Sequence, residues 1–261
     1  MASTRLGWGL RAWVVVVAVL LLAPTLVVIP MSFSASTTFE FPPSHWSLRW
    51  YGEFFNSAEW RAALWHSLEV GLLVGVLATV LGVAAAVGLD RSRFRGRGAV
   101  RSLMMAPLIM PGIVVAIAIY AVFLRWKLNG TLTGFVMAHT MLALPLVVIA
   151  VGTSLAGYDR TVEVASASLG AGPWTTFRRV TLPLLAPGVL SGFVFAFVTS
   201  LDEVVIALFL QTPQLKTLPV LMYESITLEI DPTIAAASSL VVVATTAVLL
   251  LGQLARRRSE P

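Results

Sequence analysis

Two adjacent carboxylates, Asp202 and Glu203, lie within the apolar run 189–210 and are the groups in the chain best placed for chemistry. A carboxylate within a membrane costs about 2.5–3.5 kcal/mol on insertion scales, so we expect the pair to face a cavity or a partner helix. At a rise of about 1.5 Å per residue, Asp202 would lie roughly 20 Å along a helix that begins at residue 189. Adjacent helical side chains point about 100° apart, so the two carboxylates cannot serve one ligand identically.

Two interpretations of this carboxylate pair remain open. In the structural one, both groups hydrogen-bond to neighbouring helices or to a partner subunit. In the functional one, at least one of them lines a passage and attracts a cationic solute. The passage would then include Thr199, Ser200 and Phe195, and the ring of Phe195 or Phe209 could add a cation–π contact.

Residues for enzymatic catalysis are missing from the sequence. The two lysines, Lys127 and Lys216, do not belong to a phosphate-binding G-x4-G-K-[ST] loop. The three histidines, His45, His66 and His139, lack metal-ligand spacing. His139 could serve as a proton relay or hydrogen-bond to a neighbouring helix, and we expect the hydrogen bond. The sequence therefore predicts no catalytic residue, no metal and no cofactor on this chain.

The composition is that of a membrane protein. Of the 261 residues, 57% are hydrophobic and 12% are charged, and the mean hydropathy is +0.87. A soluble domain of this size cannot hide so much apolar surface, whereas a bilayer can solvate it. There is no cysteine, which excludes disulfides and thiolate metal sites. The net charge of +5 is better explained by membrane orientation than by nucleic-acid binding.

Apolar runs of about 20 residues match the thickness of a bilayer, and the sequence contains six of them. They predict an all-α integral membrane protein with six transmembrane helices in one domain, residues 1–261. A cleaved signal peptide is the alternative for the first run, but we expect a retained helix, kinked at Pro24. Pro107 and Pro111 should bend or unwind the third. The approximate spans are 13–31, 64–88, 100–123, 132–151, 189–210 and 233–251.

Basic residues are distributed unequally between the two sides of these spans. The excess of arginine predicts that both termini and the segment 158–188 are cytoplasmic. The arginine-rich side holds Arg5, Arg11, Arg91, Arg93, Arg95, Arg97, Arg101, Arg160, Arg178, Arg179, Arg256, Arg257 and Arg258, and the other side holds Arg49, Arg61, Arg125, Lys127 and Lys216.

The segment 158–188, here called the elbow, is a hydrophilic break between the fourth and fifth apolar runs. Gly170 and Gly172 can end one short helix, and Pro173 suits the first turn of another. A bent pair of short helices outside the membrane would suit a surface that another protein grips. The two helices are expected over 161–169 and 174–180.

The elbow resembles the EAA loop of ABC importer permeases, whose pattern is E-A-A, three residues, Gly, nine residues, Ile, any residue and Leu-Pro. Nine residues separate Gly170 from Val180, and Leu182 and Pro183 follow after one more. This half of the pattern matches in both spacing and residue type. The chain is therefore similar to the permease subunits of binding-protein-dependent, type I ABC importers.

The E-A-A half of the pattern is shifted in this sequence. Val164, Ala165 and Ser166 occupy the three positions, and Glu163 falls one position earlier. Ala165 and Leu169, four residues apart, place an apolar stripe on the first elbow helix. The resemblance implies that the elbow couples to an ATPase through Glu163, Ala165, Leu169, Gly170, Ala171, Pro173, Phe177, Leu182 and Pro183.

Within that family the chain is most similar to spermidine/putrescine permeases. The shared stretches are W-S-L-x-W-Y at 46–51, A-H-T-M-L-A-L-P at 138–145, S-L-D-E at 200–203 and T-L-P…D-P-T-I-A-A-x-S at 217–238. The resemblance implies a multi-pass inner-membrane subunit of a bacterial ATP-driven importer, which passes a polyamine from an external binding protein to the cytoplasm. Its partners would be an ABC ATPase dimer and a second, different permease, with which it would form a heterodimer.

Other functions remain open at this stage. Within the family, the solute could instead be an aminophosphonate, an opine or ferric iron. Outside it, an ion-coupled carrier could use His139, Asp202 and Glu203 as a proton relay. A membrane scaffold is a third alternative, which the intramembrane carboxylates disfavour.

Overall fold

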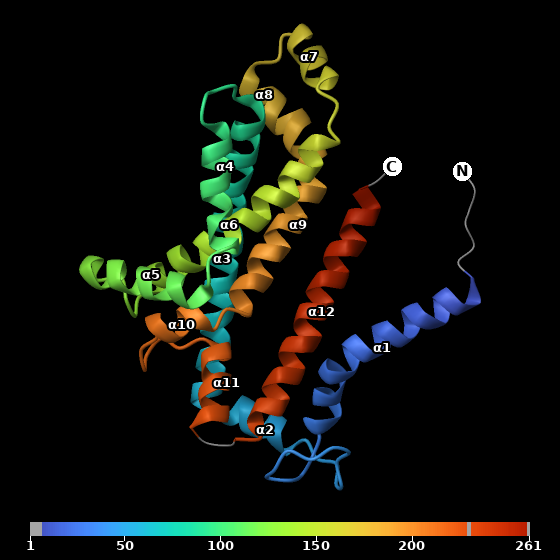
Figure 1. Ribbon diagram of the computed structural model, residues 1–261, viewed down its shortest axis with the longest axis vertical. Helices are drawn as coiled ribbons and strands as arrows, with labels where there is room; N and C mark the ends of the chain where they lie inside the picture. Colours follow the sequence, from blue (N-terminus) through green and yellow to red (C-terminus); the bar gives the residue numbers. More distant parts are fainter. Residues whose placement is uncertain (1–6, 229–230, 260–261) are drawn as a thin grey trace. The chain divides into compact units, whose positions relative to one another are not determined.

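The computed structural model describes residues 7–228 and 231–259, and every regular element within them is a helix (Figure 1). Bridging between extended segments is confined there to two isolated residue pairs, Ser34 with Trp46 and Thr212 with Leu215. The chain divides into two compact units. The first unit comprises Met1–Arg61 and Glu224–Thr246, and the second comprises Ala62–Tyr223 and Ala247–Pro261.

Three continuous helical stretches of the described residues are long and apolar enough to cross a membrane: α3 (Ala58–Arg91), α6 (Leu132–Ala156) and Pro173–Leu201. Two bent helix pairs raise the number of candidate spans to five. The apolar part of α12 (Thr233–Ser259) is shorter, Thr233–Val248. The structure thus supports an all-helical membrane protein with three to five candidate spans, where the sequence predicted six.

Both bent pairs lie where proline was expected to interrupt a helix. Helix α1 (Trp8–Met31) bends by 49° between Ala23 and Thr25. The third apolar run forms three elements, and its two halves, Arg97–Leu108 and Gly112–Trp126, meet at 102°. A proline ring removes a backbone donor and clashes with the preceding turn, which explains the bend at Pro107 and Pro111. The three elements are α4 (Arg97–Met105), η1 (Ala106–Leu108) and α5 (Gly112–Trp126).

The other helices are shorter or follow the elbow. They are α2 (Arg49–Asn56), α7 (Thr161–Ser168), α8 (Pro173–Thr176), the π-helical turn η2 (Phe177–Thr181), α9 (Leu182–Leu201), α10 (Val205–Leu210) and α11 (Leu218–Thr227).

In the first unit, polar side chains connect three segments that are distant in sequence. The hydroxyl of Tyr51 on α2 lies 2.7 Å from Ser32 Oγ, after the end of α1, and donates to Ser239 Oγ on α12 at 3.2 Å. The Tyr51 ring also packs against Phe33, with 5.2 Å between the ring centroids. A single tyrosine therefore holds α1, α2 and the start of α12 together.

In the second unit, α6 and α9 pack along each other at glycines of α9. A Cβ on Gly188 would overlap the side chain of Ser154, and one on Gly192 would lie 3.0 Å from Val147. Small residues let helix backbones approach closely in a membrane. The pair forms the centre of an apolar core, to which α3, α5 and α10 contribute Val70, Val74, Ala78, Val115, Ala116, Ile119, Phe123, Ile206, Ala207 and Leu210.

Candidate functional site

The first short helix of the elbow and the turn at Gly170 form as the sequence predicted, whereas the second helix is not separate, because α8, η2 and α9 run on as one helical stretch, Pro173–Leu201. Helix α7 ends at Ser168, and Gly170 follows with a φ of 82°. This is the left-handed region, which glycine enters without the steric cost that a side chain brings. Pro173 then occupies the first turn of α8, where its missing N–H costs nothing.

Glu163 anchors the elbow to the rest of the second unit. Its Oε1 accepts hydrogen bonds from Arg91 Nη2 at 2.5 Å and from Thr181 Oγ1 at 2.7 Å. Partial burial alone would raise the pKa of this carboxyl. The Thr181 hydroxyl and the positive charges of Arg91 and Arg160 outweigh that effect and lower the pKa below its ordinary value. The Glu163 carboxylate therefore connects α7, on which it lies, to the end of α3 and to η2.

Two further contacts fix the same region. Arg160 forms an ion pair with Asp90 near the end of α3. The hydroxyls of Ser166 and Thr176, 3.0 Å apart, connect α7 to α8. The elbow helices are thus tied to α3 and to each other by polar side chains.

The elbow exposes three large apolar side chains, Val164, Leu169 and Trp174, which we call the elbow face, although Arg178 and Arg179 are exposed as well. Leu169 is 89% exposed and Trp174 is 71% exposed. The Trp174 ring stacks on Phe177, with 5.7 Å between the centroids, and Phe177 in turn packs against the core. Large apolar side chains on a hydrophilic loop are typical of a protein-binding surface.

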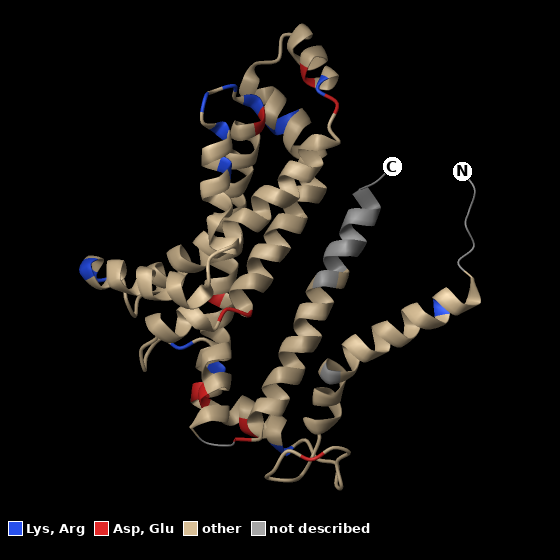
Figure 2. Ribbon diagram, in the orientation of Figure 1, with Lys and Arg blue, Asp and Glu red and all other residues tan. Residues whose placement is uncertain are grey.

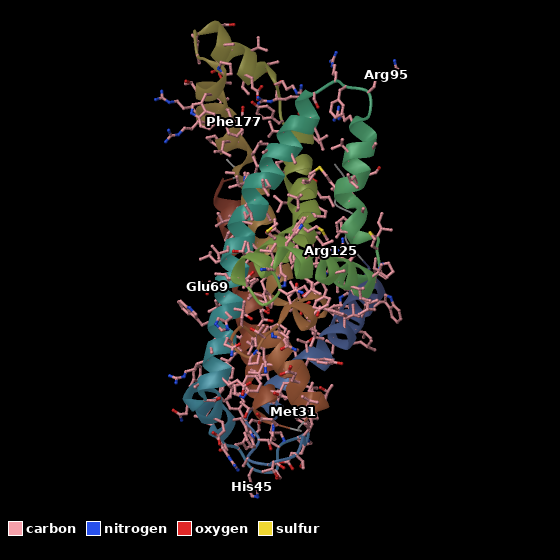
Figure 3. The ribbon with its side chains drawn as sticks, turned by 90° about the vertical axis from the view of Figure 1, so that its left-hand side faces the viewer. Met31, His45, Glu69, Arg95, Arg125 and Phe177 are labelled. Atoms are coloured by element: carbon pink, nitrogen blue, oxygen red, sulfur yellow. The ribbon has the colours of Figure 1, made fainter. Side chains whose placement is uncertain are left out.

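The other residues expected to take part in coupling lie elsewhere in the elbow. Figure 3 shows Phe177 at the same end of the second unit as Arg95, in the loop between α3 and α4. Sequence reasoning missed the roles of Arg91, Thr181 and Trp174. Of the remaining expected residues, Ala165, Pro173 and Pro183 are exposed, and Ala171 and Leu182 are half-buried.

The carboxylate pair does not lie inside a continuous helix, which corrects the prediction for 189–210. Helix α9 ends at Leu201, and α10 begins at Val205. Glu203 Oε1 accepts from the backbone N–H of Ile206 at 2.8 Å, and its Oε2 accepts from that of Ala207 at 2.9 Å. The helix can be interrupted here because the Glu203 side chain satisfies the free donors that start the next one.

His139 of α6 joins this break to the neighbouring helix. Its side chain is 1% exposed, and Nδ1 lies 2.9 Å from Ser200 Oγ of α9. Its Nε2 lies 3.5 Å from Glu203 Oε2, and the Glu203 side chain is 9% exposed. The predicted hydrogen bond between His139 and a neighbouring helix is confirmed. We call His139, Ser200 and Glu203 the buried cluster.

Asp202 differs from its neighbour. It is exposed, and within the described part of the chain its carboxylate has no hydrogen-bond or ion-pair partner. Of the other residues expected along the pathway, Thr199 is half-buried, and Phe195 lines a cavity of about 290 Å³ between α6 and α9. The two carboxylates thus have different environments: Glu203 forms hydrogen bonds within the fold, whereas Asp202 is exposed and has no described partner.

The distribution of other charges is uneven as well. Lysines and arginines gather at the end of the second unit that carries the elbow and the loop after α3 (Figure 2). Among the residues searched, 7–228 and 231–259, no group of three or more His, Asp or Glu side chains could hold a metal ion.

A family of binding-protein-dependent transport system inner membrane components matches residues 78–260 of this chain. The chain belongs to this family. It is the permease component of an ABC transporter, a multi-pass protein of the inner membrane, and is not itself the ATPase. The family carries no resident cofactor.

Individual relatives transport different solutes. The putrescine transport system permease protein PotI of Escherichia coli is 32% identical, over 87% of this chain and 85% of its own. The spermidine/putrescine permease PotC of Haemophilus influenzae is 29% identical, over 95% and 96%. The molybdenum transport system permease ModB of Mycobacterium bovis is 38% identical, over 75% and 79%.

The fold is that of a known importer. A chain of a bacterial ABC transporter that imports the acidic polysaccharide alginate matches with a TM-score of 0.73 and 14% identity, over 97% of this chain and 96% of that one. At this identity the match establishes the shared fold and not a shared solute.

Proposed function

We propose that this permease imports a polyamine and that Asp202 is the carboxylate which meets the cation on its way. The observation that carries the proposal is the environment of Asp202: an exposed acidic side chain, without a described partner, at a break between two apolar helices. An ionised carboxylate there attracts a cation in a medium of low dielectric constant. The similarity to putrescine and spermidine/putrescine permeases points to the same class of solute.

The elbow is the proposed contact with the ATPase. Its face exposes Leu169 and Trp174, while Glu163 accepts hydrogen bonds from Arg91 and Thr181. The concentration of arginine at this end favours a cytoplasmic elbow and cytoplasmic termini, which is the side where ATP is available. The complete importer would also contain a second permease, in a heterodimer, and an external substrate-binding protein.

The proposed mechanism couples movement at the elbow to the pathway. Closure of the ATPase dimer on ATP displaces the elbow, and the membrane helices change from inward-facing to outward-facing. Substrate released by the binding protein then enters past Asp202. Such coupling requires that the elbow face bind the ATPase with different affinity in the two states.

Import of an oxyanion is a second candidate function, favoured by the 38% identity to a molybdenum permease. The exposed Asp202 argues against it, because like charges repel across a desolvated passage. Arginines cluster at the elbow end, away from the break (Figure 2).

The solute proposal is tested by uptake into proteoliposomes that contain the complete transporter. We expect Asp202→Asn to raise the KM for putrescine and spermidine at least tenfold, because the attracting charge is lost. Glu203→Gln should retain the wild-type KM in the transporter that folds. Molybdate should neither be transported nor compete. Unchanged polyamine uptake by Asp202→Asn, or molybdate uptake by the wild type, would refute the proposal.

The coupling proposal is tested with two glycines of the elbow. A Cβ on Gly170 or on Gly172 meets no atom within 4 Å, but only Gly170 has a positive φ. A β-branched residue is strained at that conformation. We expect Gly170→Val to abolish transport and substrate-stimulated ATPase activity and Gly172→Val to preserve both. Survival of both activities in Gly170→Val removes the elbow from the coupling pathway.

A further inference from the structure

Two cavities of opposite character border both α4 and α6, and α3 also lines the polar one, whereas η1 and α5 form most of the apolar one. One has a volume of about 450 Å³, and its walls include Arg97, Arg101 and Thr153. The other has a volume of about 590 Å³ and is lined only by apolar side chains, Met104 and Leu144 among them. Both belong to the second unit, and neither includes a residue of the elbow or of the buried cluster.

The arginines of the polar cavity are not neutralised by the protein. Arg97 and Arg101, four residues apart, lie on the same side of α4 and are exposed. Neither forms an ion pair with any residue of the described chain. Asp90 also borders this cavity, but its carboxylate is paired with Arg160. The cavity therefore carries two uncompensated guanidinium groups.

The two cavities follow one another along the same helix–helix seam. On α6, Leu144 lines the apolar cavity, and Val148, one turn or about 6 Å further on, lines the basic one. On α4, Met104 borders the apolar cavity, and the adjacent Met105 borders the basic cavity. A ligand that filled both would need an anionic head and an apolar tail.

We propose that the α4–α6 seam binds an anionic phospholipid, with its phosphate between Arg97 and Arg101 and an acyl chain in the apolar cavity. Guanidinium groups form strong, charge-assisted hydrogen bonds to phosphate oxygens. Basic pockets between transmembrane helices are suited to such head groups. A free phosphate could occupy the arginines but would leave the apolar cavity unfilled, which favours the lipid.

A lipid bound at this site would also influence the position of the bent span formed by α4, η1 and α5. Helix α4 leads directly into the 102° bend, and the basic cavity is bordered by Asp90, which anchors the elbow through Arg160. A lipid that bridges α4 and α6 would thus hold the bend and the base of the elbow in place. Transport should depend on anionic lipid for this reason.

The proposal is tested by native mass spectrometry of the transporter purified through this chain, with added phosphatidylglycerol or phosphatidylcholine. We expect retained phosphatidylglycerol in the wild type, and at least a tenfold lower affinity in Arg97→Ala/Arg101→Ala. The matched control is Arg93→Ala/Arg95→Ala, which removes two arginines of the neighbouring loop that do not line the cavity. The control should retain the lipid.

Two further arms distinguish the source of the anion. Inorganic phosphate at millimolar concentration should not displace the lipid, and Ala118→Trp, which fills the apolar cavity, should weaken lipid binding with the arginines intact. If phosphate displaced the lipid and Ala118→Trp left lipid binding unchanged, the ligand of the arginines would be a free anion, and the proposal would be overturned. Arg97→Lys/Arg101→Lys, which keeps the charge, should bind with intermediate affinity.

The remaining rival is an acidic protein surface. If Arg97→Ala/Arg101→Ala lost the co-purifying ATPase while it retained phosphatidylglycerol, the arginines would be a protein contact and the lipid site would be refuted. Loss of the lipid with the ATPase still bound supports the proposal.

Discussion

The elbow and the buried cluster each hold one glutamate with a hydroxyl side chain and a nitrogen-containing side chain nearby. Glu163 is met by Thr181 and Arg91, whereas Glu203 caps a helix and lies against His139. The side chains of Glu163 and Arg91 are 23% and 40% exposed, so water competes for their charges. The side chains of Glu203 and His139 are 9% and 1% exposed, so water competes little.

This difference in burial assigns different roles to similar groups. An ion pair near water contributes little stability but can still set the position of a loop. When a buried acceptor loses its donor, or a buried donor loses its acceptor, the protein pays the full desolvation free energy of the group that is left without a partner. We therefore expect the buried cluster to contribute to the stability of the folded protein, and the elbow contacts to set the position of α7.

The largest effect is expected when the buried acceptor is removed. Glu203→Leu leaves the backbone N–H groups of Ile206 and Ala207 without an acceptor, at a cost of about 1–3 kcal/mol for each. The thermal midpoint of the purified transporter should fall sharply. Asp202→Leu is the control and should change it little, because that carboxylate has no described partner. Equal midpoints for the two variants would contradict the assignment of Glu203 to the fold.

A smaller effect is expected for the histidine contact. In a double-mutant cycle of His139→Ala and Ser200→Ala, the coupling free energy should be about 0.5–1.5 kcal/mol, as for a typical internal hydrogen bond. Thermal unfolding of the four proteins measures it. Additive effects of the two substitutions would mean that this contact does not stabilise the helix pair.

At the elbow the expected pattern is reversed. Glu163→Gln should change stability by less than about 1 kcal/mol, since the ion pair is partly exposed. Substrate-stimulated ATPase activity should fall severalfold because Arg91 no longer positions α7. Asp159→Asn is the matched control: its side chain can still accept from the Thr161 N–H, and its activity should remain. A fall in stability without a fall in coupling would reverse the comparison.

The smallest effect concerns pH. The folded chain lowers the pKa of Glu163 below its ordinary value, so the stabilisation is present above that value and is lost as the pH falls through the folded pKa. The midpoint difference between wild type and Glu163→Gln should be constant around neutral pH and should vanish under strongly acidic conditions. Thermal unfolding across this range measures it, and a difference that grew on acidification would contradict the sign.

Features with local causes were predictable from the sequence. The turn in the elbow was predictable because Gly170 and Pro173 constrain their own backbone. The bends at Pro24 and at Pro107–Pro111 were predictable for the same reason. The membrane character followed from composition, although the described residues support three to five candidate spans rather than six.

Features with distant causes were not predictable in the same way. Arg91 is 72 residues from Glu163, and no periodicity indicates their contact. The break after Leu201 involves neither glycine nor proline. It depends on Glu203, which was interpreted as a helical residue although acidic residues at a helix start are a known capping signal.

The close packing of α6 against α9 has a mechanical consequence. The elbow is the connection between these two helices, which contact each other at Gly188 and Gly192 and share the His139–Ser200 hydrogen bond further along. Because Gly188 lies against Ser154 and Gly192 against Val147, the two helices are in close contact next to the elbow, and the proposed coupling would move them together. Asp202 directly follows the last residue of α9, so under the proposed coupling a displacement of the elbow would be transmitted along this helix to the carboxylate.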